Sequence, residues 1–235
     1  MSSSSSEIRA ASPVGAPVDG APAPLPARVR LEGRYVRLEP LTASAHGQAL
    51  FEHTAGPEHA GLWTYMFDGP FADRASFDAA LQRWAESQDP LYYAIVDRAS
   101  AVALGRAALM RIDRTHRVIE VGGIVYSPRL QRTRGATEAM YLLARYVFDD
   151  LGYRRYEWKC NALNEPSRTA AVRLGFTFEG IFRQHMIVKG RNRDTAWYSM
   201  LDVEWAARKA RFERWLAPEN FDAAGRQLTS LSRYC

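Results

Sequence analysis

Two stretches near the middle of the chain have residue types and spacing that suit them to chemistry. The first is a short basic loop, formed by Gln131, Arg132, Thr133, Arg134, Gly135, Ala136 and Thr137. It leads into a segment with helical spacing, and the first N–H groups of a helix lack partners within the helix and carry the positive end of its dipole. We therefore predict that this loop binds a pyrophosphate, with the two arginines adding charge beside it. The alternative is a solvated basic turn.

The second stretch contains one carboxylate, Glu120, within the apolar run of residues 118–121. A strand at this place would bury both neighbours of Glu120, and burial of an unpaired carboxylate raises its pKa. A raised pKa is typical of a side chain that accepts a proton near neutral pH. The alternative interpretation is an ion pair across the strands, with Arg111 and Arg117 as the nearby candidates.

A strand, the loop and a helix would position these residues. Residues 118–126 are rich in β-branched side chains and stop at Ser127 and Pro128, which predicts a strand. Residues 138–150 predict a helix, because apolar side chains recur at helical spacing before the glycine stop at Gly152.

The rest of the chain predicts a mixed α/β (α+β) protein. Strands are expected over residues 33–40, 91–96, 102–112, 153–160, 176–188 and 194–203. Helices are expected from Thr42 to residue 54, from Asp73 to about residue 89, from Asn164 to Gly175 and over residues 204–217. Residues 56–71 form an aromatic stretch without clear periodicity, which is typical of a packed loop or of part of a binding mouth.

The chain resembles the GNAT superfamily of acyl-CoA N-acyltransferases, most closely its RimJ/RimL-like branch. The resemblance covers roughly residues 32–203 and rests on Glu120, Gly122, Pro128, Gln131, Arg132, residues 136–139 and 164–167, Gly175, Phe176, Glu179, Gly180, Arg193 and Asp194. The family loop usually reads Q/R-x-x-G-x-G/A, whereas this chain has Arg134 at the first glycine position and a glycine at the next. The resemblance implies a mixed, mostly antiparallel sheet with flanking helices, in which one parallel strand pair splays.

This resemblance also implies acetyl-CoA as the co-substrate. The loop residues 131–137 would hold its pyrophosphate, and Asn164 and Ser167 would contact its arm. The backbone of Ile124, Val125 and Tyr126 would run beside the pantetheine, as an added strand does. No metal is expected, because the five histidines show no ligand spacing.

The catalytic residues are also interpreted through the family. Its base role is often assigned to a strand glutamate, and the matching position here is Glu120. Its common general acid, a tyrosine, is replaced by Ala171. The RimJ/RimL-like branch has a serine proposed as thiolate donor, so we name Ser167 as the substitute; the alternative is a hydroxyl that bonds its own backbone. Tyr198 is a weaker candidate, more typical of a strand aromatic facing the acceptor pocket, and Trp63 and Tyr65 are expected in the acceptor wall.

Composition divides the chain into three regions. Residues 1–28 are rich in Ser, Ala and Pro and predict a flexible tail, residues 29–203 form the acyltransferase domain, and residues 204–235 form a C-terminal helix and tail. The net charge is +5, but acidic and basic residues are interspersed, which disfavours a nucleic-acid site. Cys160 and Cys235 have no spacing of a disulfide framework or metal site. We find no apolar run that would span a membrane and no secretory signal, so a cytoplasmic protein without a membrane partner is expected.

The sequence therefore predicts an acetyl-CoA-dependent N-acetyltransferase. It would move an acetyl group to a primary amine, either the α-amine of a protein or peptide or the amine of a small molecule, by direct transfer in a ternary complex. No cysteine or serine stands with a histidine in a nucleophilic arrangement. The alternative is a non-catalytic acyl-CoA-binding regulatory module, favoured by Ala171 and Arg134. Dimers are frequent in the family, and the Trp-rich segment 204–217 is the candidate interface of a homodimer.

Overall fold

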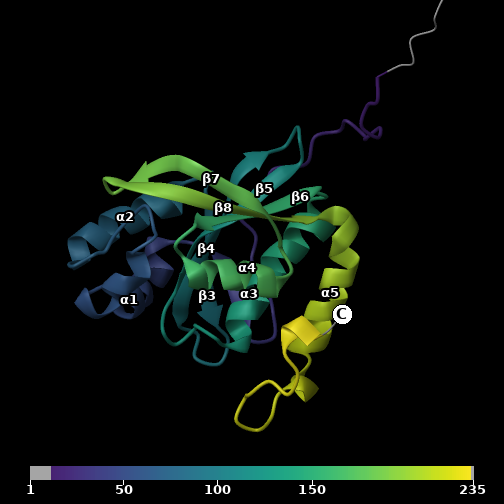
Figure 1. Ribbon diagram of the computed structural model, residues 1–235. Helices are drawn as coiled ribbons and strands as arrows, with labels where there is room; N and C mark the ends of the chain where they lie inside the picture. The colour runs from purple at the N-terminus through teal and green to yellow at the C-terminus, as the bar shows by residue number, and fades with distance from the viewer. Residues whose placement is uncertain (1–11, 234–235) are drawn as a thin grey trace, which may run out of the picture.

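A mixed sheet forms the centre of the protein, for which the computed structural model describes residues 12–233 (Figure 1). Within these residues the eight strands lie in the order β1-β2-β3-β4-β5-β6-β8-β7. Among these eight described strands, only β5 and β6 pair in parallel. The strands are β1 (Leu31–Glu32), β2 (Val36–Pro40), β3 (Leu91–Asp97), β4 (Ala103–Asp113), β5 (Val118–Tyr126), β6 (Arg155–Asn161), β7 (Thr177–Val188) and β8 (Arg191–Leu201).

Helices cover both faces of this sheet. On one face, α1 (Ala43–Thr54), the 3-10 turn η1 (Pro57–Trp63) and α2 (Arg74–Glu86) enclose an aromatic-rich core over β3 to β5. The other face carries α3 (Arg134–Arg145), its continuation η2 (Tyr146–Asp150), α4 (Glu165–Leu174) and α5 (Asp202–Leu216). Short 3-10 turns η3 (Pro218–Asn220) and η4 (Leu231–Arg233) follow α5. The predicted mixed sheet with one parallel pair and flanking helices is confirmed.

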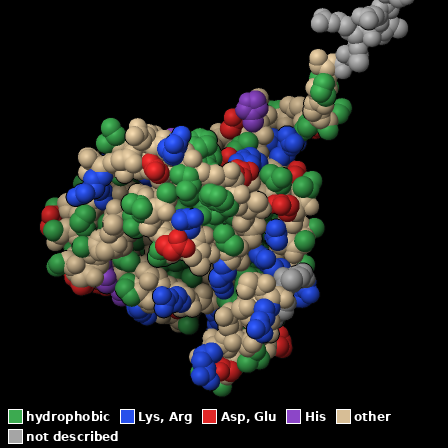
Figure 2. Space-filling view, viewed as in Figure 1, with side chains coloured by type: hydrophobic (Ala, Val, Ile, Leu, Met, Phe, Trp, Pro, Cys, Tyr) green, Lys and Arg blue, Asp and Glu red, His purple; other side chains and the backbone are tan. Residues whose placement is uncertain are grey.

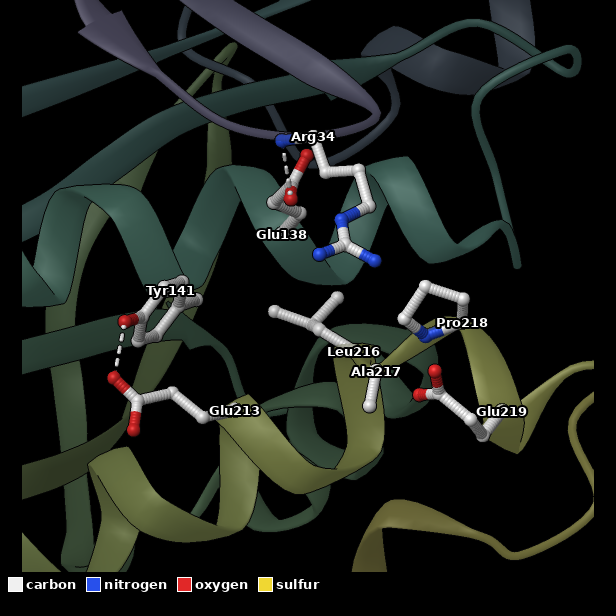
Figure 3. A pocket seen from close by; sticks show the side chains of 8 residues that line it. All are labelled: Arg34, Glu138, Tyr141, Glu213, Leu216, Ala217, Pro218 and Glu219. Atoms are coloured by element: carbon white, nitrogen blue, oxygen red, sulfur yellow. Dashed lines mark hydrogen bonds between the residues drawn. The ribbon is translucent and has the colours of Figure 1, made fainter.

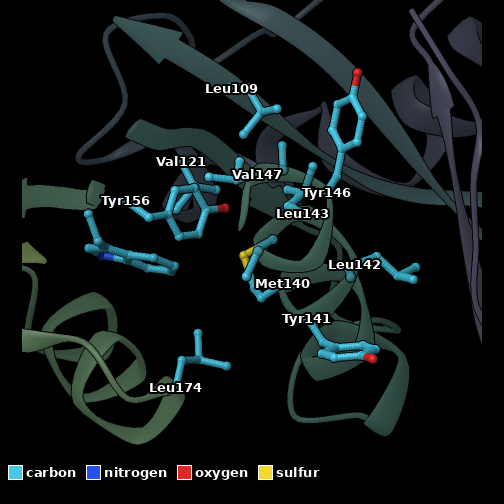
Figure 4. Close-up of a cluster of buried hydrophobic side chains, with 14 of the residues drawn as sticks. Leu109, Val121, Met140, Tyr141, Leu142, Leu143, Tyr146, Val147, Tyr156 and Leu174 are labelled. Atoms are coloured by element: carbon cyan, nitrogen blue, oxygen red, sulfur yellow. The ribbon is translucent and has the colours of Figure 1, made fainter. Parts of the chain in front are cut away.

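The larger core lies between α3 and the sheet. Met140 and Leu143 of α3 and Val147 of η2 point toward Leu109, Val121 and Tyr156 of β4, β5 and β6 (Figure 4). These six side chains are at most 4% exposed. Each Å² of apolar surface removed from water stabilises the fold by about 25 cal/mol. The burial of these side chains therefore holds α3 against the parallel strands.

Local side-chain caps set where the helices begin. Thr42, Asp73 and Asn164 accept backbone N–H bonds at the first turns of α1, α2 and α4, as the sequence predicted. The helix expected over 138–150 begins earlier, at Arg134, because Thr133 caps it by accepting the N–H of Ala136 at 3.1 Å. The second half of the predicted loop is therefore the first turn of α3.

Part of the segment expected to be a flexible tail lies against the domain. Ala23 is only 3% exposed and exchanges two hydrogen bonds with Arg114. The Tyr153 hydroxyl donates to the carbonyl of Pro24 and the Tyr93 hydroxyl to that of Ala27, both at 3.1 Å. Composition did not indicate this, because the bonds use backbone groups that every residue carries. Residues 1–11 lie outside the described residues, as does Cys235.

The C-terminal helix packs on its own domain. Trp205 stacks with Phe148 and donates from Nε1 to Asp149 at 2.6 Å, and Phe212 packs on Tyr141. Trp205 and Trp215 are 5% and 3% exposed. These tryptophans, offered as a dimer interface, are thus buried within the chain. Within residues 12–233 no helix is long and apolar enough to cross a bilayer.

Candidate active site

The parallel strands β5 and β6 pair over only part of their length. Residues 118–121 of β5 pair with residues 155–158 of β6, and the last pair is Val121 with Trp158. Beyond it, β5 stays paired with β4, while β6 stays paired with β8 as far as Asn161. The two strands therefore separate, and the backbone of residues 122–126 faces the opening.

A bulge in β5 prepares this backbone. The pairings of Ala108 with Gly122 and of Arg106 with Val125 leave two residues of β5 opposite one of β4. Gly123 takes a φ of +58°, which favours glycine. The bulge reverses the direction of the side chains: Val121 joins the core on the α3 side, whereas Val125 joins the core on the α1 side. Ile124 and Tyr126 then pack on the α3 side.

The basic loop lies between the end of β5 and the start of α3. Gln131 donates from Nε2 to the carbonyl of Tyr126 at 3.0 Å and so connects loop and strand. Gly135, the displaced glycine, is buried, and a Cβ there would lie 2.8 Å from Val36. Its role is thus a close contact between α3 and β2. The first N–H groups of α3 still point out of the helix at this loop.

Arg134, the other departure from the family pattern, is held by aromatic rings. Its guanidinium lies 4.1 Å from the ring centre of Tyr35 and 5.5 Å from that of Phe221. These rings fix its side chain beside the β1–β2 turn and the segment after α5. The same turn is held by Glu138, whose carboxylate accepts the N–H groups of residues 34–36 at 2.6 to 2.8 Å.

Glu120 is buried where the strands begin to separate, with a side chain 5% exposed. Burial raises the pKa of its carboxyl, against the opposing effect of two cations. Arg111 lies 3.1 Å and Lys159 lies 2.9 Å from the same oxygen, Oε2. Both sequence interpretations therefore describe this residue, since its pKa is raised and it is also ion-paired. Arg111 is the arginine that pairs with it.

Two residues of this cluster were missed by the sequence analysis. Lys159 also contacts Glu157 at 2.6 Å, and its ammonium lies 3.9 Å from the ring centre of Trp197. Glu157 stands directly opposite Glu120 in the parallel register. The available signal was the alternation of Glu157 and Lys159 with two aromatic residues on one predicted strand.

Ser167 and Asn164 lie on the other side of β6, at the start of α4. Asn164 accepts the N–H of Ser167 at 3.3 Å as the helix cap. The Ser167 hydroxyl accepts a hydrogen bond from Trp158 Nε1 at 3.0 Å, and a hydroxyl that accepts can still donate its own hydrogen. Ala171, at the position of the family's tyrosine, is fully buried.

The structure does not bring Tyr198 together with the expected acceptor wall. In the register of β6 with β8, Tyr198 lies opposite Trp158, and it is 2% exposed on the α4 side. Its hydroxyl receives a hydrogen bond from Arg168 at 3.3 Å. The neighbouring Trp197 is the aromatic residue on the Glu120 face.

The aromatic stretch contacts the rest of the domain at several points. Trp63 is a packed core residue, 1% exposed, that donates from Nε1 to the carbonyl of Thr54. Tyr65 donates to the carbonyl of Leu163 at 3.1 Å, and Lys189 of the β7–β8 turn donates to the carbonyls of Trp63 and Asp68, each at 2.8 Å. The stretch therefore spans from α1 to the β7–β8 hairpin.

Two surface features lie outside this cluster. A hollow between α3 and the end of α5 is lined by Arg34, Glu138, Tyr141, Glu213 and residues 216–219, on the sheet face opposite Glu120 (Figure 3). Its Tyr141 hydroxyl is occupied by Glu213 at 2.9 Å. Hydrophobic side chains also gather over β7, β8 and α4 (Figure 2), where Val172, Phe178 and Ile181 are exposed. Among the described residues no group of three or more His, Cys, Asp or Glu side chains is placed to hold a metal ion.

The sequence and the structure were compared with those of known proteins. Residues 36–177 match the family model described as an acetyltransferase (GNAT) domain. The crystal structure of a GCN5-related N-acetyltransferase from Brucella melitensis is 53% identical, with a TM-score of 0.90, and the match covers 92% of this chain and 98% of that one. A probable acetyltransferase of the GNAT family from Chromobacterium violaceum is 40% identical, with a TM-score of 0.77 and coverage of 84% and 99%.

A curated protein from Bacillus subtilis named "Putative ribosomal N-acetyltransferase YdaF" is 25% identical over 178 residues, which are 73% of this chain and 92% of that protein. The family match spans more than half of the sequence and includes the separating strands and the loop before α3. This chain belongs to the GNAT family of acetyltransferases.

Proposed function

We propose that this protein is an acetyl-CoA-dependent N-acetyltransferase that transfers the acetyl group directly to a primary amine. One observation carries the proposal: a buried carboxylate with a raised pKa, Glu120, lies at the point where β5 and β6 separate. A base in that position is next to the backbone that an extended thioester arm would follow. The family match supports the reaction class.

The residues at the opening suit the parts of acetyl-CoA. The first turn of α3, with residues 131–137, would hold the pyrophosphate through free N–H groups and the charge of Arg132. The backbone of Ile124, Val125 and Tyr126 would accept the pantetheine as an extra strand. Asn164 and Ser167 would border the arm from the side of β6 and α4.

In the proposed reaction the amine nitrogen attacks the thioester carbonyl carbon, and the carbon–sulfur bond breaks. Glu120 takes the proton that the amine loses, directly or through water. Ser167 donates its hydroxyl proton to the departing thiolate and regains a proton from water, while its oxygen accepts the hydrogen bond of Trp158. Cys160 is not a nucleophile in this scheme, because burial raises the pKa of its thiol and keeps it protonated.

An α-amino group is the acceptor that the surroundings of Glu120 favour. Three cations on this face, Arg111, Lys159 and Arg193, outnumber its two carboxylates, Glu120 and Glu157, and so disfavour an acceptor that arrives as a cation. An α-amine has a pKa near 7.7–8.0, against about 10.4 for a lysine side chain, so a larger fraction is neutral at physiological pH. The name of the B. subtilis relative also points to protein substrates.

The test is release of free thiol from acetyl-CoA with peptides of different N-termini, polyamines and aminoglycosides as acceptors. We expect turnover with peptides. Glu120→Gln should lower kcat/KM by roughly 10²–10⁴-fold, because the neutral amide accepts no proton. The control is Glu219→Gln, an exposed change outside the site, which should keep wild-type turnover.

The base role of Glu120 also predicts how activity changes at acidic pH. Glu120 must be ionised to act, and burial raises its pKa, so activity should fall as the pH drops through a value above the usual 4.5. A Glu120→Gln enzyme with full activity would remove the base assignment. Tight CoA binding by an inert wild type would instead favour the regulatory module, for which Ala171 is the structural argument.

A further inference from the structure

Lys159 lies where the parallel strands β5 and β6 begin to separate. It is the first residue of β6 after the last β5–β6 pair, and it lies on the same face as Glu120 and Glu157. Its ammonium is 2.9 Å from Glu120 and 2.6 Å from Glu157, and the side chains of the three residues are at most 10% exposed. One buried cation is thus shared by two buried carboxylates.

We propose that Lys159 is a positioning residue for acetyl transfer: it fixes the Glu120 carboxylate at the strand opening and holds it in the charged form, while Glu157 competes for the same ammonium. The inference rests on the proposed role of Glu120 as the base. It adds to that role the pair of residues that decide at which pH the base is ready.

The charges around Glu120 support this division of labour. An opposite charge within about 4–6 Å favours the ionised form of a carboxyl, and a like charge disfavours it. Lys159 and Arg111 act in the first sense and Glu157 in the second. The Arg111 side chain is 41% exposed, so water screens it, whereas Lys159 is 5% exposed and screened little.

The remaining groups near this cluster hold Lys159 in place or add to its charge. The ring of Trp197 lies against the Lys159 ammonium, and the ring of His185 of β7 lies against the ring of Trp197. Arg193 of β8 adds a third cation near Glu120, after Lys159 and Arg111, and it also lies near Cys160 of β6. Arg155 binds Glu157 at 2.7 Å, so Glu157 keeps a partner when Lys159 is removed.

The experiment compares kcat/KM against pH for two variants with opposite expected shifts. Lys159→Met removes the cation, so the acid limb should move to higher pH by about one unit or more, with kcat/KM below the limb falling about tenfold for each unit. Glu157→Gln removes the competing carboxylate, so the limb should move to lower pH. Loss of packing alone would not shift the limb in two directions.

The control is Lys209→Met, which removes an ion-paired lysine of α5 outside this cluster. Lys209 lies 2.7 Å from Asp149, and its replacement should leave the acid limb unchanged. A second readout is independent of turnover: the pH titration of the Glu120 carboxyl by ¹³C NMR, with its signal identified by its absence in Glu120→Gln. The titration should shift in the same two directions.

The outcomes separate this inference from the proposed function. Limbs and titrations that stay in place in both variants, or that move in the same direction, would overturn the role of Lys159 even if the enzyme is active. Opposite shifts of the Glu120 titration in a protein that releases no thiol with any acceptor would support the coupling and count against the proposed function alone.

Discussion

Gly123 determines the faces of the sheet to which the side chains at the end of β5 point. Its φ of +58° places the bulge in β5, and this bulge turns Val125 to one core and Ile124 to the other. The backbone beyond it faces the opening between β5 and β6. The position therefore connects one backbone angle to the proposed binding of pantetheine.

Gly123→Ala should weaken both stability and catalysis. A residue with a Cβ pays about 1–2 kcal/mol in the left-handed region, and here the Cβ would also lie 3.0 Å from Tyr92 and 3.2 Å from Arg106. We expect denaturant unfolding to show a loss of at least that size, with a lower kcat/KM. Gly152→Ala is the matched control, because Gly152 has a φ of +65° and nothing within 4 Å of the added Cβ. It should lose stability but keep activity, and equal activity in both variants would contradict the role of the bulge.

At the scale of the element, α3 joins the proposed pyrophosphate site to the core. Its first turn is set by the cap from Thr133 and by the contact of Gly135 with Val36. Its next turns carry the buried side chains of Figure 4. A defect in the cap should therefore affect the loop without disturbing the core contacts farther along the helix.

Replacement of Thr133 tests this helix start. Thr133→Ala removes the oxygen that accepts the Ala136 N–H, and loss of such a cap costs about 0.5–2 kcal/mol. CoA affinity, measured by calorimetry, should fall as well, because the first turn frays. Thr133→Ser keeps the oxygen and should restore most of both quantities. If the serine variant behaved like the alanine variant, the cap would not be the cause.

At the scale of the whole molecule, the N-terminal segment and α5 extend the domain beyond its sheet. Residues 21–28 supply backbone partners for three tyrosine hydroxyls, those of Tyr93, Tyr146 and Tyr153. At the opposite end of the chain, α5 buries Trp205 against Tyr141 of α3 and Trp215 against Arg173 of α4. Both ends thus contribute to the core on the α3 side.

Two truncations measure the contribution of the N-terminal segment. A chain that begins at residue 29 should melt several degrees below one that begins at residue 19, because only the longer one keeps Ala23 and these hydrogen bonds. Each bond contributes about 0.5–1.5 kcal/mol net. Equal melting temperatures in the two truncated chains would show that the segment adds nothing to stability. Acetyl transfer should survive in both, since the segment touches none of the proposed site residues.

The sequence by itself determined the elements and several of their ends. Caps at Thr42, Asp73 and Asn164 act within four residues, so local chemistry was enough to predict the starts of α1, α2 and α4. The apolar run around Glu120 predicted its burial and its raised pKa for the same local reason. The family resemblance supplied the sheet type and the reaction class.

Tertiary structure alone decided which residues meet. Alternation along one strand placed Glu157 and Lys159 on one face, but only the parallel register of β5 with β6 put that face beside Glu120. The antiparallel register with β8 placed Trp197 there and turned Tyr198 to the other side. Strand pairing joins residues far apart in the chain, and a shift of one residue exchanges the faces, so no local pattern fixes it. The helices and strands could therefore be predicted from the sequence, whereas the set of residues that meet in the site depended on the register of the strands.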